Sequence, residues 1–135
     1  MIQDYGHWTI KGGIPEDAIG FIYKVTNNKT NRKYIGKKLL KFKKTQKPLK
    51  GNKNKRRSLI DSKWREYTGS STALNEDIKN IGKENFTFEI LCWANCKSEL
   101  NYAELREIIT VDALHDPLYY NEFVGGKIRI RKPQP

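Results

Sequence analysis

The stretch GFIYKVTNNKTNRKYIGK, at residues 20–37, decides the fold. Its first part, residues 21–26, is rich in β-branched and aromatic types, which favour a strand. The letters NNKTNR then supply turn chemistry, and residues 33–37 return to strand-forming types. The stretch therefore predicts a β-hairpin that carries Tyr23 on its first strand and Tyr34 on its second.

The chain beyond this hairpin alternates between helical and extended patterns. Ser70 and Ser71 are suited to cap a helix that Gly82 would end. The expected elements are a helix at 72–81, a strand at 86–93, a helix at 97–114 and an edge strand at 127–131. This order predicts an α+β domain in which helices flank a small antiparallel three-stranded sheet.

Positive charge is concentrated in one segment of the chain. The net charge is +11, and residues 32–57 contain thirteen Lys or Arg and no Asp or Glu, which leaves 11 − 13 = −2 for the rest. A concentrated cationic segment indicates a polyanionic partner. Pro48 and Gly51 argue against an amphipathic membrane helix here, so we expect nucleic acid and not a membrane.

The same patterns divide the chain into three parts. We expect an irregular arm at 1–19, one domain at 20–125, and a basic tail at 126–135. A long basic insertion at about 38–62, a loop or broken helix, follows the second strand. With no secretion signal and no long apolar run, a cytoplasmic location is expected, in the host cell if a phage encodes the chain.

The hairpin motifs resemble those that name the GIY-YIG nuclease family. Gly20-Phe21-Ile22-Tyr23 is followed, after ten residues, by Tyr34-Ile35-Gly36. The resemblance continues through Glu104 and Tyr120-Asn121, covers about residues 20–125, and is greatest to small stand-alone endonucleases of bacteriophages. It implies an endonuclease that hydrolyses duplex or branched DNA with Mg²⁺, for which Mn²⁺ can substitute.

Two features depart from the family pattern. Phe21 stands where the family usually has glycine, and no arginine aligns with the one that the family places after the second motif. The candidates for this cationic role are Lys37, Lys38, Arg56, Arg57 and Arg65. Of these, Lys37 and Arg57 are included in the expected catalytic set.

The hairpin itself indicates how two phenols could serve this chemistry. Tyr23 shares a strand face with its neighbours two residues away, as do Tyr34 and Gly36, so the phenols can meet and Gly36 leaves room for a phosphate. A phenol titrates near 10 unless nearby cations lower its pKa. The resemblance implies that Tyr23 helps to activate the attacking water and that Tyr34 helps to place the water or the phosphate.

Glu104 is the expected metal ligand. At about 100° per residue, Glu104 and Glu107 both fall on the apolar stripe defined by Leu100 and Val111. A carboxylate on such a stripe is costly unless it is paired or binds a metal, and one carboxylate with waters is ordinary Mg²⁺ ligation. A buried pair with Lys or Arg is the alternative, and Glu107 is the reserve ligand.

The remaining polar candidates would bind DNA. They are Lys38, Lys41, Lys43, Lys44, Lys47, Arg56 and Asn121. Asn121 would either contact a phosphate or hold the hairpin by hydrogen bonds. The alternative function is a non-catalytic nucleic-acid-binding protein, in which the carboxylates would form buried ion pairs with Lys or Arg. The sequence leaves the oligomeric state open.

Overall fold

The computed structural model describes residues 5–10, 12–46, 51, 56–124 and 128–130, with backbone alone for 42–46 and 56–58. A four-stranded sheet lies at the centre, in the order β1-β6-β2-β3. Its strands are β1 (Trp8–Thr9), β2 (Gly20–Asn27), β3 (Lys33–Leu39) and β6 (Phe86–Ala94). Strand β2 pairs antiparallel with β3 and β6, whereas β1 pairs parallel with β6.

The sheet is therefore mixed and four-stranded, and the expected three-stranded antiparallel sheet was wrong. The fourth strand comes from the arm that was expected to be irregular. Trp8 is buried there, its ring contacts Phe21 and Phe88, and its Nε1 donates to the carbonyl oxygen of Trp64 at 2.7 Å. Two residues are too few to show a periodic pattern, so only tertiary contacts define this strand.

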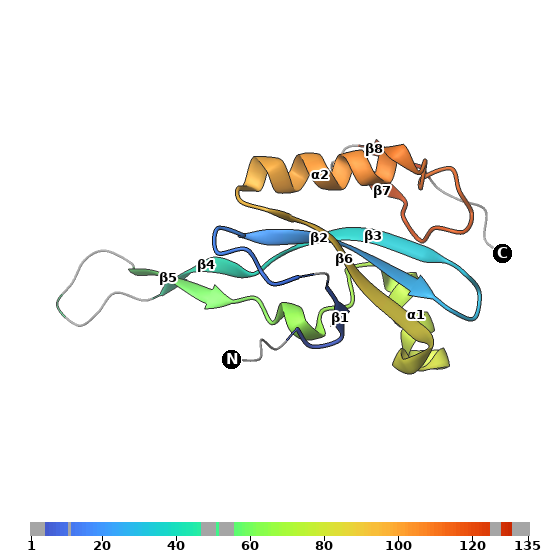
Figure 1. The fold of residues 1–135 in the computed structure, drawn as a ribbon, viewed down its shortest axis with the longest axis horizontal. Helices are drawn as coiled ribbons and strands as arrows, with labels where there is room; N and C mark the ends of the chain where they lie inside the picture. Colours follow the sequence, from blue (N-terminus) through green and yellow to red (C-terminus); the bar gives the residue numbers. More distant parts are fainter. Residues whose placement is uncertain (1–4, 11, 47–50, 52–55, 125–127, 131–135) are drawn as a thin grey trace.

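One helix covers each face of the sheet (Figure 1). Helix α1 (Thr72–Ile81) begins at Ser71, whose Oγ accepts from the N–H of Leu74, and Gly82 ends it as expected. Helix α2 (Lys97–Thr110) is four residues shorter than the range 97–114 predicted. The chain leaves the helix there, because Asp112 adopts a positive φ of 52°.

Alternation along β2 assigns the apolar side chains to two cores. Ile22 and Ile35 pack beneath α2, together with Leu100, Ala103 and Ile108. The opposite face carries the aromatic core, formed by Trp8, Phe21, Tyr23, Val25, Trp64, Leu74, Phe86, Phe88 and Tyr120. The short 3₁₀ helices η1 (Trp64–Glu66) and η2 (Lys83–Asn85) complete this side. The two phenols of the hairpin motifs thus lie on the α1 side.

The basic segment contains a second, two-stranded sheet. Strand β4 (Lys41–Gln46) pairs antiparallel with β5 (Arg56–Asp61), and together these strands, called the basic ribbon below, extend away from the central sheet (Figure 1). The expected loop or broken helix was wrong for these residues. Backbone pairing does not need an apolar pattern, so a lysine-rich strand gives little periodic signal.

The last described strands form a small hairpin near the end of the chain. Strand β7 (Phe123–Val124) pairs antiparallel with β8 (Ile128–Arg129), which confirms extended structure within the range 127–131. Among the residues that the structure describes, no helix has the length and apolar character needed to cross a membrane.

Candidate active site

Three tyrosines meet on the α1 side of the hairpin. Tyr23 lies opposite Gly36 in the β2–β3 register, and the ring centroids of Tyr23 and Tyr34 are 6.1 Å apart. Tyr67, which directly follows η1, places its ring 6.0 Å from that of Tyr23 at an interplanar angle of 88°. These three residues are called the phenol cluster. The expected approach of Tyr23 and Tyr34 is confirmed, and Tyr67 is an addition that the sequence analysis missed.

Two glycines give the phenol cluster its space. A Cβ added at Gly36 would lie 2.5 Å from Cζ of Tyr23, so the Tyr23 ring occupies the volume above Gly36. Gly69 has a φ of +100°, and a Cβ there would lie 3.1 Å from the Tyr23 hydroxyl and 3.2 Å from Cε1 of Tyr34. The expectation that Gly36 leaves room for a phosphate was therefore wrong: it leaves room for Tyr23.

Two of the three phenols, those of Tyr23 and Tyr34, are held in the neutral form. Burial raises the pKa of Tyr23 well above 10, and Tyr34, Tyr67 and Glu104 raise it further. Burial also raises the pKa of Tyr34, against a hydrogen bond of 3.2 Å between its hydroxyl and Ser70 Oγ. The expectation that nearby cations lower these pKa values was wrong, because burial, the largest cause for both phenols, raises them.

Glu104 lies on α2 within electrostatic reach of the two phenols. Its side chain is 20% exposed, and its Oε1 is 3.8 Å from Nζ of Lys37, which also donates to Oδ1 of Asn101 at 2.5 Å. Burial raises the pKa of Glu104, and Lys37 opposes that shift. Glu107 is instead 3.8 Å from Arg106, away from this arrangement. The Glu–Lys pair that the sequence left as an alternative is thus present at Glu104.

One carboxylate near the phenols fits a magnesium ion. No group of three or more His, Cys, Asp or Glu side chains gathers as a metal cage within the described ranges. Magnesium retains several waters and commonly takes a single carboxylate together with substrate phosphates. A half-buried carboxylate with a raised pKa gains from a cation nearby, so the Glu104 donor fits this mode of binding.

Lys38 is the described cation that lies against the phenol cluster. Its Nζ is 4.0 Å from the centre of the Tyr67 ring, and burial lowers its pKa. Lys37, the neighbouring residue on β3, points to the opposite face and α2. Arg65 contacts Asp61 at 3.8 Å and stacks on Trp64 at 4.6 Å.

The other predicted cations give less information. Lys41 is exposed at the start of β4. The side chains of Lys43, Lys44, Arg56 and Arg57, and the whole of Lys47, lie outside the described residues. Their expected contacts with DNA stay predictions.

Asn121 holds the second motif in place. It is buried, its Oδ1 accepts from the N–H of Ile35 at 3.0 Å, and its Nδ2 donates to the carbonyl oxygen of the same residue at 2.8 Å. The amide thus replaces a neighbouring strand along the edge of β3. Asn121 was expected either to contact a phosphate or to hold the hairpin by hydrogen bonds. The observed geometry is the second of these, a structural clamp on Ile35.

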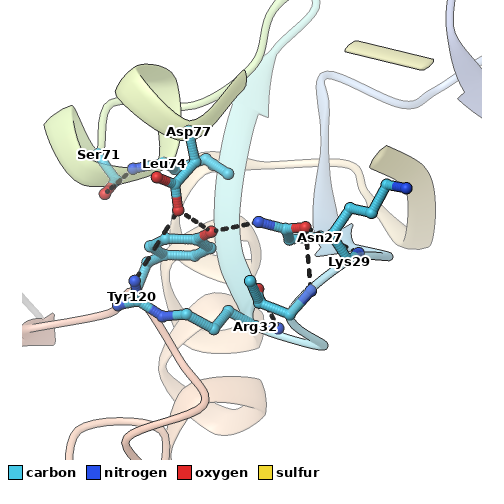
Figure 2. A network of polar contacts seen from close by, with 8 residues as sticks. Asn27, Lys29, Arg32, Ser71, Leu74, Asp77 and Tyr120 are labelled. Carbon is cyan, nitrogen blue, oxygen red and sulfur yellow. Dashed lines mark hydrogen bonds and ion pairs between the residues drawn. The ribbon is translucent and has the colours of Figure 1, made fainter. Parts of the chain in front are cut away.

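The neighbouring Tyr120 belongs to a polar network below the α1 terminus. Its hydroxyl donates to Asp77 at 2.6 Å and accepts from Nδ2 of Asn27 at 3.1 Å (Figure 2). Arg32 lies 4.1 Å above the Tyr120 ring and 3.9 Å from Asp77. The network joins β2, α1 and the segment before β7. Sequence reasoning missed it, because its members are far apart in the chain.

Comparison with known proteins agrees with this architecture. A family model described as "Putative endonuclease segE, GIY-YIG domain" matches residues 5–124. The chain is 39% identical over 61 residues to Endonuclease segA of Enterobacteria phage T4. That alignment covers 45% of this chain and 27% of the relative, so most of the relative lies beyond it. No solved structure matches the chain.

Proposed function

The chain belongs to the GIY-YIG endonuclease family, and on that premise we propose that it hydrolyses DNA phosphodiester bonds with the help of a divalent metal ion. The observation that carries the proposal is the proximity of the phenol cluster to a half-buried carboxylate, Glu104. A protein that only binds phosphates gains nothing from an acidic side chain beside them, because the two negative charges repel.

The residues divide the work of hydrolysis between them. The oxygen of a water forms a bond to phosphorus as one ester P–O bond breaks, the water loses a proton, and the leaving oxygen gains one. A divalent cation bound by Glu104, Mg²⁺ or in its place Mn²⁺, would stabilise the charge that develops on the phosphate and lower the pKa of nearby water and phenols. Tyr23 and Tyr34 orient the water and the phosphate through their hydroxyl groups.

Tyr23 acts as a neutral phenol at physiological pH. Its raised pKa disfavours a standing phenolate in the absence of a bound cation, so it orients the water as a hydrogen-bond acceptor and takes a proton only as its own proton leaves. Tyr67 is hydrogen-bonded to Tyr23 and can relay that proton, because it takes up the proton as it passes its own hydroxyl proton to solvent. Lys38, stacked on Tyr67, supplies the positive charge beside this pair; it was one of the five sequence candidates for this role, of which Lys37 and Arg57 were placed in the expected catalytic set.

The basic ribbon grips the phosphate backbone in this proposal. The lysines of β4 and the segment beyond it are part of residues 32–57, in which the excess positive charge of the chain lies, and phosphate contacts of this kind add affinity without sequence selectivity. The substrate is accordingly DNA, duplex or branched, that lies across the ribbon and the phenol cluster.

Supercoiled plasmid tests the proposal. Purified protein should nick or linearise it in Mg²⁺ or Mn²⁺ from neutral to alkaline pH, and EDTA should stop the reaction. The matched variants are Glu104→Gln, which should be inactive, and Glu107→Gln, which should cut like the wild type. An intact plasmid under all of these conditions, with binding retained, would contradict the proposal.

A second function is favoured by one observation, the ion pair between Glu104 and Lys37. If this pair is only a core contact, the protein is a non-catalytic DNA binder. Lys37→Met separates the two cases. In the nuclease, it frees Glu104 and tightens Mn²⁺ binding, measured by the paramagnetic broadening of water or protein resonances. In the binder, it changes stability alone.

A further inference from the structure

A groove of about 710 Å³ runs from the phenol cluster to the β7–β8 hairpin. Tyr34 and Ser70 lie at its inner end, and Phe123 and Arg129 line it at β7 and β8. Its volume is typical of sites that hold a small organic group. Because Tyr34 belongs to the candidate active site, whatever occupies the groove is adjacent to the phosphate that is cut.

The charge of the groove differs from that of a phosphate-binding surface. Three carboxylates, Glu76, Asp77 and Glu122, face two guanidinium groups, Arg32 and Arg129. A phosphate backbone would be repelled by the carboxylates. A nucleobase edge presents hydrogen-bond donors and acceptors together, and a lining of mixed acceptors, donors and hydroxyl groups complements it.

The groove also offers an aromatic surface. Phe123 is 53% exposed, and Arg129 stacks on its ring at 4.7 Å while it pairs with Glu122 at 3.4 Å. Exposed aromatic rings backed by arginine are surfaces on which unpaired bases stack. A base within an intact duplex cannot reach such a surface, because it is already stacked and paired.

The floor of the groove is rigid. Tyr120 is held between Asp77 and Asn27 and covered by Arg32, as Figure 2 shows. Asn121, the next residue, is fixed by both backbone groups of Ile35. A preformed floor of this kind loses little freedom when a ligand binds, which favours binding in this groove over binding on a mobile surface.

We propose that this groove binds one unpaired nucleobase beside the scissile phosphate, stacked on Phe123, so that the protein prefers DNA with a bulged or mismatched nucleotide over fully paired DNA. The inference rests on the proposed function, because it takes the phenol cluster as the place of cleavage.

Binding in EDTA tests the inference without any cleavage. Two duplexes of equal length are compared by fluorescence anisotropy, one fully paired and one with a single bulged nucleotide. The wild type should bind the bulged duplex about 5–150-fold more tightly, the range given by stacking of one base. Phe123→Ala should lose that preference and keep its affinity for paired DNA. Phe123→Trp should retain the preference.

The control is Tyr102→Ala, which removes an aromatic ring of similar exposure, 61%, from α2 outside the groove. It should leave both affinities unchanged. Equal affinity of the wild type for the two duplexes would overturn the inference, as would an equal loss on both from Phe123→Ala.

Cleavage assays keep the two proposals apart. A protein that prefers the bulged duplex through Phe123 but cuts no DNA in Mg²⁺ or Mn²⁺ refutes the proposed function and leaves the groove as a binding site. A protein that cuts plasmid but shows no such preference refutes only the groove.

Discussion

The phenol cluster and the basic ribbon lie on the same polypeptide but differ in how they use charge. In the cluster, Tyr23 is buried and Tyr34 is half-buried beside two glycines, burial raises the pKa of both phenols, and one carboxylate lies nearby. The ribbon is a separate two-stranded sheet that extends from the core and carries five of the thirteen Lys and Arg residues of 32–57. Desolvation is the main cause of the pKa shifts of Tyr23 and Tyr34 in the first region, whereas screened attraction to phosphates would set the DNA affinity that we propose for the second.

From this difference we expect that mutations can change the cleavage rate and the affinity for DNA separately. A change in the cluster should alter the rate at saturating DNA and leave binding intact. A change in the ribbon should alter binding and its salt dependence, and leave that rate intact. The predictions below test this separation, from the largest expected effect to the smallest.

Glu104→Gln should reduce cleavage to background while DNA binding is retained, since only the proposed metal ligand is lost. Burial raises the pKa of Glu104, so its ionised form destabilises the fold above the ordinary pKa of 4.5. The variant removes this cost, and its unfolding temperature at neutral pH should not fall. Plasmid nicking, anisotropy and thermal unfolding measure the three quantities. Cleavage at the wild-type rate by Glu104→Gln would contradict the assignment of Glu104 as the metal ligand. An inactive Glu107→Gln would indicate that Glu107 takes this role instead.

Tyr23→Phe should lower the single-turnover rate about 10²–10⁴-fold, the range for a group that assists proton transfer. The phenyl ring still fills the space above Gly36, so stability should change little. Tyr102→Phe is the matched control, because Tyr102 is exposed on α2. Because burial keeps Tyr23 neutral, the wild-type rate should rise with pH through the neutral range and show no plateau from a phenolate of low pKa. A wild-type rate from Tyr23→Phe removes the residue from the mechanism.

The ribbon variant replaces Lys41, Lys43, Lys44 and Lys47 together by Gln. Each phosphate neutralised adds about 0.9 to the slope of log affinity against log salt, so the slope should flatten by up to about 3–4 units. Binding should weaken alike on all sequences, and the rate at saturation should survive. An unchanged slope would show that the ribbon faces something other than DNA. A lost rate at saturation would place one of these lysines in the active site.

His7 links the cluster to stability in acid. Burial, aided by the charge of Lys83, lowers the pKa of His7 to about 4, while its Nε2 donates to the carbonyl oxygen of Tyr67 at 2.9 Å. The folded state therefore binds the proton less well than the unfolded state does. The stability associated with neutral His7 is present above pH 6.5 and is lost as the pH falls towards 4.

We expect this loss to reach about 1–2 kcal/mol, after discounting for the half-exposed ring. Urea unfolding of the wild type and of His7→Gln between pH 4 and 7 measures it, and the two curves should converge in acid. His115→Gln is the control, because His115 is exposed and pairs with Asp112. Parallel curves for the wild type and His7→Gln would show that His7 does not titrate with folding.

The sequence by itself determined the local elements and the motif pair. Alternation in residues 20–37 sufficed for the hairpin, and a serine cap and a glycine end sufficed for α1, because these signals act between near neighbours. The same alternation put Tyr23 and Tyr34 on one face, and the helical period put Glu104 at the margin of a buried stripe. These inferences needed no knowledge of distant residues.

Only the tertiary structure decided what surrounds these residues. The parallel strand at Trp8, the arrival of Tyr67 beside Tyr23, the pairing of Glu104 with Lys37 and the clamp of Asn121 on Ile35 all join residues far apart in the chain. Burial also reversed the expected direction of the phenol pKa values, because desolvation depends on every atom packed around a group. A sequence pattern shows which side chains share a face; the packing of the whole chain decides how far water is excluded from them.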